Sequence, residues 1–309
     1  MMSRTLCHLS SVLSLLVIAT AVPADQVDVA RQIIDDAGVT GGLIVHVGCG
    51  SGDLTAALKL GPQFLVHGVD TDQAAIDTAR RDISSDGAYG DIAVDLWDGR
   101  RLPYGDNMVN LVVTERATKA VTREAMRVLA PLGVMMTRKG DAWGKQVKEW
   151  PDDIDEWSHY LHGPDNNAVA HDQRVAPPRS LQWTGSPRWA RHHDRLSSTT
   201  ALVSAGGRIF YIFDEGPGES IMVPSEWAVI ARDAFNGVVL WKREIADWQT
   251  RLWPLKSGPA QLPRRLVATG DTVFTTLGID VPVTALDAET GETARVYEGT
   301  EGTEEILHS

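Results

Sequence analysis

The sequence predicts an α/β Rossmann-like domain followed by an all-β region. Three observations support this prediction. An apolar run at 43–47 leads into three alternating glycines, and a second apolar run at 64–69 ends in a carboxylate. After residue 197, short β-branched and aromatic runs alternate with glycine turns. A chain of 309 residues is long enough for two such domains.

Residues 1–24 are typical of a secretory signal peptide. Arg4 is their only charged residue, an apolar stretch spans 12–22, and small residues offer cleavage sites near Ala21 and Ala24. The apolar stretch is shorter than the roughly twenty residues that a membrane-spanning helix needs, and no later stretch approaches that length. We therefore expect an exported protein, periplasmic or extracellular, without a transmembrane segment after cleavage.

The glycine run is predicted to approach a nucleotide-like ligand. Gly48, Gly50 and Gly52 let the backbone turn sharply, and a helix starting near Asp53 directs its free N–H groups at the same space. Asp70 follows about twenty residues after the glycines, where a βαβ nucleotide fold places a carboxylate on ribose hydroxyls. A purely structural turn is the alternative, because glycines commonly link strands to helices.

The spacing of the glycines favours one class of cofactor. A dinucleotide-binding loop needs a glycine one position after Gly52, where this chain has Asp53, so nicotinamide and flavin cofactors are disfavoured. The run at 47–52, Val-Gly-Cys-Gly-Ser-Gly, resembles the loop of class I S-adenosylmethionine-dependent methyltransferases. This resemblance implies S-adenosylmethionine as cofactor and contacts to it from four loop residues: Gly48, Cys49, Gly50 and Gly52.

The resemblance extends over roughly residues 27–140. Residues 98–107 resemble the segment after the third strand, where an acidic residue contacts the adenine amino group, and Asp98 matches that position. Residues 108–114 are similar to the fourth strand, and 122–133 resemble the helix and turn that lead to the fifth.

Two positions depart from the family pattern. Asn110 stands where an aspartate is usual, and Leu132 replaces a glycine of a Pro-Gly-Gly turn. Neither change removes a cofactor contact. Both suggest relaxed constraint, so a domain that keeps the fold without catalysis is an alternative interpretation.

Methyl transfer from a sulfonium is an in-line displacement, so alignment of donor and acceptor can supply most of the acceleration. The acceptor side is expected in the loop after the fourth strand, which holds Thr114 and Glu115. Glu115 is a candidate base or acceptor-orienting group; a solvated loop carboxylate is the alternative. Export conflicts with this activity, because S-adenosylmethionine is made in the cytosol.

Cysteine content and net charge exclude some roles. Cys49 is the only cysteine beyond the predicted signal peptide, so the mature chain cannot form an internal disulfide. A thiol between glycines is better interpreted as a small loop residue than as a nucleophile. The net charge of -12 argues against a nucleic-acid partner bound through phosphate contacts.

Residues 143–196 are predicted to form an irregular connector that packs on the region after it. His159 and His162 are three residues apart and would share one face of a helical turn. Together with nearby carboxylates and with His171, His192 and His193 they could hold a metal ion. No cysteine or close His-Glu pattern supports such a site, and we predict no metal.

Residues 197–309 contain five runs typical of antiparallel strands: 201–203, 208–213, 229–232, 238–241 and 273–277. Two turns nearly repeat, at 231–237 and 285–291, and each follows a strand with a glycine-containing lead, at 206–208 and 270–272. This spacing matches the blade of a β-propeller.

The repeated Asp-Ala-x-x-Gly turn, followed in its first copy by Trp241, resembles the pyrroloquinoline-quinone-like (PQQ-like) β-propeller repeat. The resemblance implies that aspartate caps the turn, that glycine takes a positive φ and that tryptophan packs between blades. A propeller closes with about four to eight blades, whereas these residues make about two. We therefore expect partial propeller blades in a truncated chain, with PQQ an unlikely cofactor.

The leading hypothesis is S-adenosylmethionine-dependent methyl transfer to an unknown acceptor by a secreted protein. Its domains would be a methyltransferase-like domain at 25–142, the connector at 143–196 and the start of a propeller at 197–309. The alternative is a non-catalytic exported scaffold whose propeller binds a protein partner. A quinone-dependent dehydrogenase is less expected, because its cofactor needs a closed ring.

Overall fold

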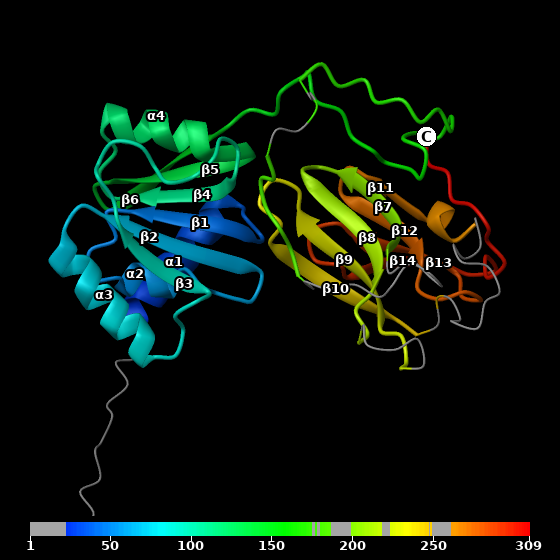
Figure 1. The fold of residues 1–309 in the computed structure, drawn as a ribbon, viewed down its shortest axis with the longest axis horizontal. Helices are drawn as coiled ribbons and strands as arrows, with labels where there is room; N and C mark the ends of the chain where they lie inside the picture. The colour runs from blue at the N-terminus through cyan, green and yellow to red at the C-terminus, as the bar shows by residue number, and fades with distance from the viewer. Residues whose placement is uncertain are drawn as a thin grey trace, which may run out of the picture.

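The computed structural model describes residues 23–174, 177, 180–186, 199–217, 223–246, 248 and 261–309. They form an α/β half and an all-β half that lie side by side (Figure 1). Most of the predicted signal peptide lies outside these residues, although Ala24 is the first residue of helix α1 (Ala24–Ala37). No helix in the described part of the chain is long and apolar enough to cross a membrane.

The α/β half is built on one six-stranded sheet. Its strand order is β3-β2-β1-β4-β5-β6, in which the first five strands are parallel and β6 runs antiparallel to β5. Because the connections reverse direction at β1, a crevice is expected at the carboxyl ends of the strands on either side of it. The strands are β1 (Gly42–Val47), β2 (Phe64–Asp70), β3 (Ile92–Leu96), β4 (Val109–Thr114), β5 (Leu129–Lys139) and β6 (Ala142–Val147).

Helices cover both faces of this sheet. Helix α1, α2 (Asp53–Ala57) and α3 (Gln73–Ser85) lie on one face, and α4 (Lys119–Val128) lies on the other (Figure 1). Strand β1 is apolar throughout because its alternate side chains enter both layers. Ile44 packs with α1–α3, whereas Val45 and Val47 pack under α4.

Strand β6 extends the α/β half beyond its predicted end at residue 142. Its six residues pair with β5, so the first residues of the predicted connector belong to the sheet. Residues 148–174 are irregular, and hydrogen bonds connect them to the β half. Ser204 N–H donates to the Trp157 carbonyl over 2.7 Å, and Ala268 N–H donates to the Ser158 carbonyl over 3.0 Å.

The connector histidines are arranged differently from a shared helical face. His159 and His162 form an isolated antiparallel bridge through their backbones, so their side chains are not one helical turn apart. His162 Nε2 lies 2.7 Å from an oxygen of Asp155. Within the described ranges, no group of three His, Cys, Asp or Glu residues could hold a metal ion, and His192 and His193 lie outside them.

The β half consists of two four-stranded antiparallel meanders. The predicted runs lie in β7–β10 and β12, whereas β11, β13 and β14 were not individually predicted. One apolar core, which includes Phe210, Trp241 and Leu286, joins the two sheets. The elements are β7 (Thr199–Ala205), β8 (Arg208–Asp214), β9 (Trp227–Asp233), β10 (Val239–Ile245), the 3₁₀ helix Leu262–Arg265, β11 (Leu266–Thr269), β12 (Thr272–Thr276), β13 (Val283–Asp287) and β14 (Thr293–Tyr297).

The two repeated turns have the same local structure. Asp233 Oδ1 accepts hydrogen bonds from the backbone N–H groups of residues 235 and 236 in its own turn, both at 2.9 Å. Asp287 Oδ1 does the same for those at 289 and 290, at 3.0 and 2.8 Å. Gly237 and Gly291 close the turns with φ of 76° and 72°. Both turns therefore have an aspartate cap and a glycine with a positive φ.

A tryptophan packs on each of these turns. Trp241 Nε1 donates to the carbonyl of Ala288 in the second turn, and Trp183 Nε1 donates to that of Ala234 in the first, both over 3.0 Å. Trp183 lies in the connector and was not recognised as part of the repeat. After the second turn, Arg295 takes the position equivalent to Trp241.

Asn110 joins the two halves. Its Oδ1 accepts from Leu43 N–H over 2.8 Å and from Asn236 Nδ2 over 2.7 Å, and its Nδ2 donates to Asp233 Oδ2 over 2.6 Å. Asn236 Nδ2 also donates to the Met108 carbonyl. The first repeated turn therefore docks at the amino-terminal end of β4, and the departure from aspartate at Asn110 has a structural reason.

Leu132, the second departure, adopts a φ of 63°. This is the left-handed conformation that a glycine takes more readily than leucine. Its backbone N–H donates to the Lys148 carbonyl over 2.9 Å, which holds the start of β5 against the end of β6.

We predict that Asn110→Asp weakens the attachment of the two halves. A carboxylate at 110 would face Asp233, whose pKa is already raised by burial, and would lose the amide donor. The expected loss is about 1–3 kcal/mol of unfolding free energy, measured by urea denaturation. The matched control is Asn107→Asp, which places the same charge 2.6 Å from Lys148 Nζ. Equal destabilisation by both variants would contradict the prediction.

We also predict acid sensitivity from His46, which lies in β1. Its Nδ1 is 2.9 Å from Thr55 Oγ1 in α2, and burial lowers its pKa from 6.5 to about 4 despite the charge of Asp70. Between these values the unfolded chain binds a proton that the folded chain excludes, so stability falls as pH drops from about 6.5 to about 4. The expected loss is roughly 3 kcal/mol.

The measurement is urea unfolding at pH 7 and pH 4.5, with His46→Gln as the comparison. The wild type should lose more stability between the two pH values than the variant does. A pH dependence of the same size in both proteins would show that His46 is not responsible.

Candidate functional site

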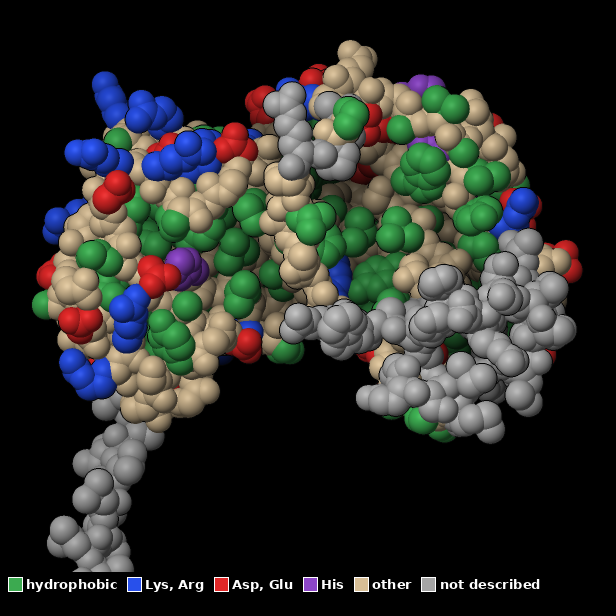
Figure 2. All heavy atoms as spheres, in the orientation of Figure 1, with side chains coloured by type: hydrophobic (Ala, Val, Ile, Leu, Met, Phe, Trp, Pro, Cys, Tyr) green, Lys and Arg blue, Asp and Glu red, His purple; other side chains and the backbone are tan. Residues whose placement is uncertain are grey.

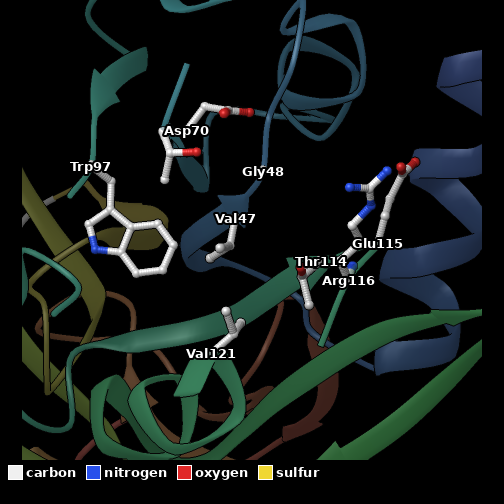
Figure 3. Close-up of a pocket in the computed structure, with 9 residues that line it drawn as sticks. Val47, Gly48, Asp70, Trp97, Thr114, Glu115, Arg116 and Val121 are labelled. Atoms are coloured by element: carbon white, nitrogen blue, oxygen red, sulfur yellow. Dashed lines mark hydrogen bonds between the residues drawn. The ribbon is translucent and has the colours of Figure 1, made fainter. Parts of the chain in front are cut away.

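A cavity of about 350 Å³ opens at the carboxyl ends of β1, β2 and β4. Figure 3 shows Asp70 on one side of it, Thr114, Glu115 and Arg116 on another, and the indole of Trp97 facing the space between. The cavity lies where the sheet topology predicts a ligand site. Its lining residues are Val47, Gly48, Asp70, Thr71, Trp97, Thr114, Glu115, Arg116 and Val121.

The three predicted glycines have two different roles. Gly48 and Gly50 have φ of 81° and 54°, and no atom lies within 4 Å of the position that a Cβ would take on either. Gly52 caps α2, and a Cβ there would stand 2.8 Å from the Cβ of Ala79 in α3. The first two glycines leave open space beside the backbone, whereas Gly52 is required for helix packing.

Asp70, the predicted ribose ligand, is held by two backbone N–H groups. Its Oδ2 accepts from Gly50 over 2.9 Å, and its Oδ1 accepts from Asp72 over 3.0 Å. An ionised carboxylate has about four acceptor positions, so both oxygens can still accept from a diol. The same contacts fix the orientation of the side chain before any ligand arrives.

Cys49 is buried in the loop and does not line the cavity. Burial raises the pKa of its thiol to about 12, with a further contribution from the charge of Asp70. Gly68 makes room for it, because a Cβ at 68 would stand 2.9 Å from the Cβ of Cys49. A protonated, buried thiol fits the prediction of a small loop residue better than a nucleophile.

Asp98 and Trp97 follow β3 in adjacent positions. Asp98 is exposed, its Oδ1 accepts from Arg100 N–H over 2.9 Å, and it is not among the residues that line the cavity. Trp97 does line it, and its Nε1 donates to the Arg101 carbonyl over 2.9 Å. Sequence reasoning singled out the carboxylate and missed the aromatic ring beside it.

Thr114 is the last residue of β4, and Glu115 follows it in the loop. Thr114 is almost completely buried, and its Oγ1 accepts from Arg116 N–H over 3.2 Å. Glu115 is exposed at the cavity wall, and Arg116, which sequence reasoning missed, lies beside it. The sequence feature that could have identified Arg116 is its position two residues after the buried strand β4.

Comparisons with known proteins agree with this geometry. Residues 44–133 match a family model described as a methyltransferase domain. An uncharacterised protein of Haemophilus influenzae is 32% identical over 191 residues, which cover 56% of this chain and 66% of that protein.

Two solved structures also resemble parts of the chain. One, described as a candidate S-adenosyl-L-methionine-dependent methyltransferase from Methanococcus maripaludis, has 24% identity over 39% of this chain and 58% of its own, with a TM-score of 0.35. The other is geranyl diphosphate C-methyltransferase from Streptomyces coelicolor, with 20% identity over 36% and 44% of the two chains and a TM-score of 0.34. The chain thus spans less than two thirds of each of these relatives.

The family match covers the parts that build the cavity. It includes β1, the glycine loop, β2 with Asp70, and β4 with the residues after it. Residues 44–133, which carry every residue that lines the cavity, therefore match a methyltransferase-domain family model.

Proposed function

We propose that this chain binds S-adenosylmethionine and transfers its methyl group to an acceptor. The observation that carries the proposal is the open cavity beside Asp70 within the methyltransferase domain. Its volume of about 350 Å³ lies in the range of small-ligand pockets. No side chain fills the space beside Gly48 and Gly50, which favours catalysis over a fold retained only as a scaffold.

In this proposal each wall of the cavity has a task. Gly48 and Gly50 allow close approach of the cofactor, and Asp70 accepts from the ribose hydroxyls. Trp97 offers an aromatic face for the adenine, and Asp98 in the same loop is proposed to accept from its amino group.

S-adenosylmethionine would supply an electrophilic methyl group. The acceptor's lone pair forms the new bond to carbon, and the electrons of the broken C–S bond remain on sulfur. Glu115 is proposed to orient the acceptor or to take its proton, since it reaches the cavity from the end of β4. The main contribution of the protein would be to align the cofactor with the acceptor.

Export is a separate proposal that rests on the pattern of residues 1–24. An exported enzyme would have to meet S-adenosylmethionine outside the compartment in which it is made. N-terminal sequencing of the mature protein tests this: a first residue of Val22 or Asp25 is expected, and a mature chain that keeps Met1 would contradict export.

We further propose that the two β sheets are blades of a PQQ-like propeller that binds a protein partner. Both sheets are four-stranded meanders, and their first strands, β7 and β11, contact each other. The tryptophan contacts of Trp183 and Trp241 recur between successive units. These features of the local structure support the proposal.

We predict that Asp70→Asn weakens binding of S-adenosylmethionine by about tenfold or more, because the charge-assisted hydrogen bonds to the ribose are lost. The measurement is calorimetric titration, and the control is Asp77→Asn on α3, away from the cavity. Tight binding by both variants would remove Asp70 from the site. Absence of binding by folded wild-type protein would favour the non-catalytic scaffold.

A further inference from the structure

Five exposed cations lie at the edge of the sheet where the cavity opens, in the loops after β3 and β4 and in the first turns of α4. We call them the cationic rim: Arg100, Arg101, Arg116, Lys119 and Arg123. Figure 2 shows Lys and Arg side chains gathered over α4, the helix that carries two of them. Among the residues that the structure describes, none of the five has an ion-pair partner within 4.0 Å.

The rim is attached to the cavity on two sides. Arg116 lines it directly, and Lys119 and Arg123 lie in the first two turns of α4, which begins shortly after the end of β4 that borders the cavity. On the other side, Arg100 and Arg101 follow Trp97, whose indole donates to the Arg101 carbonyl.

A hydrogen bond joins the two sides of the rim: Leu102 N–H, next to Arg101, donates to Glu124 Oε2 in α4 over 3.0 Å. The pKa of Glu124 in α4 is lowered chiefly by its hydrogen bond with Arg127, and the charge of Arg101 contributes. The loop after β3 and the helix after β4 thus lie close enough for their charges to act together.

The nearby carboxylates form no ion pair with the rim among the described residues. Glu124 and Asp106 are bonded to Arg127, at 2.7 and 2.8 Å. Asp98 accepts from a backbone N–H, and Asp70 does so twice. Glu115 is the remaining acidic group of the cavity wall.

Five cations at one edge of the molecule, without an ion-pair partner in the described part of the chain, stand out in a chain with a net charge of -12. Like charges kept close together repel one another, so such a cluster is stabilised when an anion binds between them. A negatively charged molecule would also be repelled by the rest of the surface and attracted to this mouth, which raises its rate of encounter.

We propose that the methyl acceptor is an anionic small molecule whose carboxylate or phosphate group is held by the cationic rim. This inference rests on the proposed function, because the rim borders the methyl-donor cavity. Arg116 is the central contact, since a guanidinium binds both oxyanions with two parallel hydrogen bonds. Lys119 and Arg123 add charge that attracts the acceptor from the α4 side.

The test uses two anions as probes, tripolyphosphate for a phosphate group and citrate for carboxylates. Each is titrated by calorimetry at low ionic strength into the full chain, with and without saturating S-adenosylhomocysteine. The variants are Arg116→Ala and the double variant Lys119→Ala/Arg123→Ala, whose alanines favour helix. The matched control is Arg81→Ala, an exposed cation on α3.

At least one probe is expected to bind wild type and Arg81→Ala equally, and to bind each rim variant about tenfold more weakly or worse. The probe that binds identifies the anionic group. Binding of neither probe, or equal binding by rim variants and control, would overturn the inference. Affinity for S-adenosylhomocysteine should be the same in all variants. If the wild type does not bind S-adenosylhomocysteine, the proposed function is contradicted. The probe titrations made without S-adenosylhomocysteine test the rim separately.

Discussion

The hydrogen bond from Gly50 N–H to Asp70 organises the α/β half. It connects the loop after β1 to the end of β2 over 2.9 Å, and so fixes the two neighbouring carboxyl ends of the sheet relative to each other. The loop can reach Asp70 only because Gly48 and Gly50 take left-handed conformations. The opening beside Gly48, the orientation of the carboxylate and the burial of Cys49 all depend on this arrangement.

The second organising contact lies at the opposite end of the same sheet. Asn110 satisfies a backbone N–H of β1 and two side chains of the first repeated turn, so one amide closes the α/β half and docks the β half. An amide suits this position because it can accept and donate at once, whereas a carboxylate only accepts. Docking at this end leaves the carboxyl ends of the strands accessible.

Much of the fold could be predicted from local sequence. Short patterns identified the glycine run, the end of β2 at Asp70 and the repeated turns. Few residue types meet the backbone requirements of these segments. Strand β6 was missed because its side chains are mostly exposed and lack an apolar pattern. Trp97 and Arg116 were missed because they line the cavity together with residues that are distant in the chain. No local sequence pattern encodes that proximity. Trp183 was missed for the same reason: its partner is a turn some fifty residues later.

The contacts of Trp183 and Trp241 give the β half a direction along the chain. Each ring covers a turn that belongs to the next unit, and each turn glycine is required because a Cβ would stand 2.3 or 2.6 Å from the ring. A unit thus depends on its predecessor for part of its core, as in nearest-neighbour models of repeat arrays. Removal of one tryptophan ring would destabilise the unit that follows it in the chain. Because the turn under Trp183 also carries Asp233 and Asn236, the first unit transmits that dependence to the α/β half.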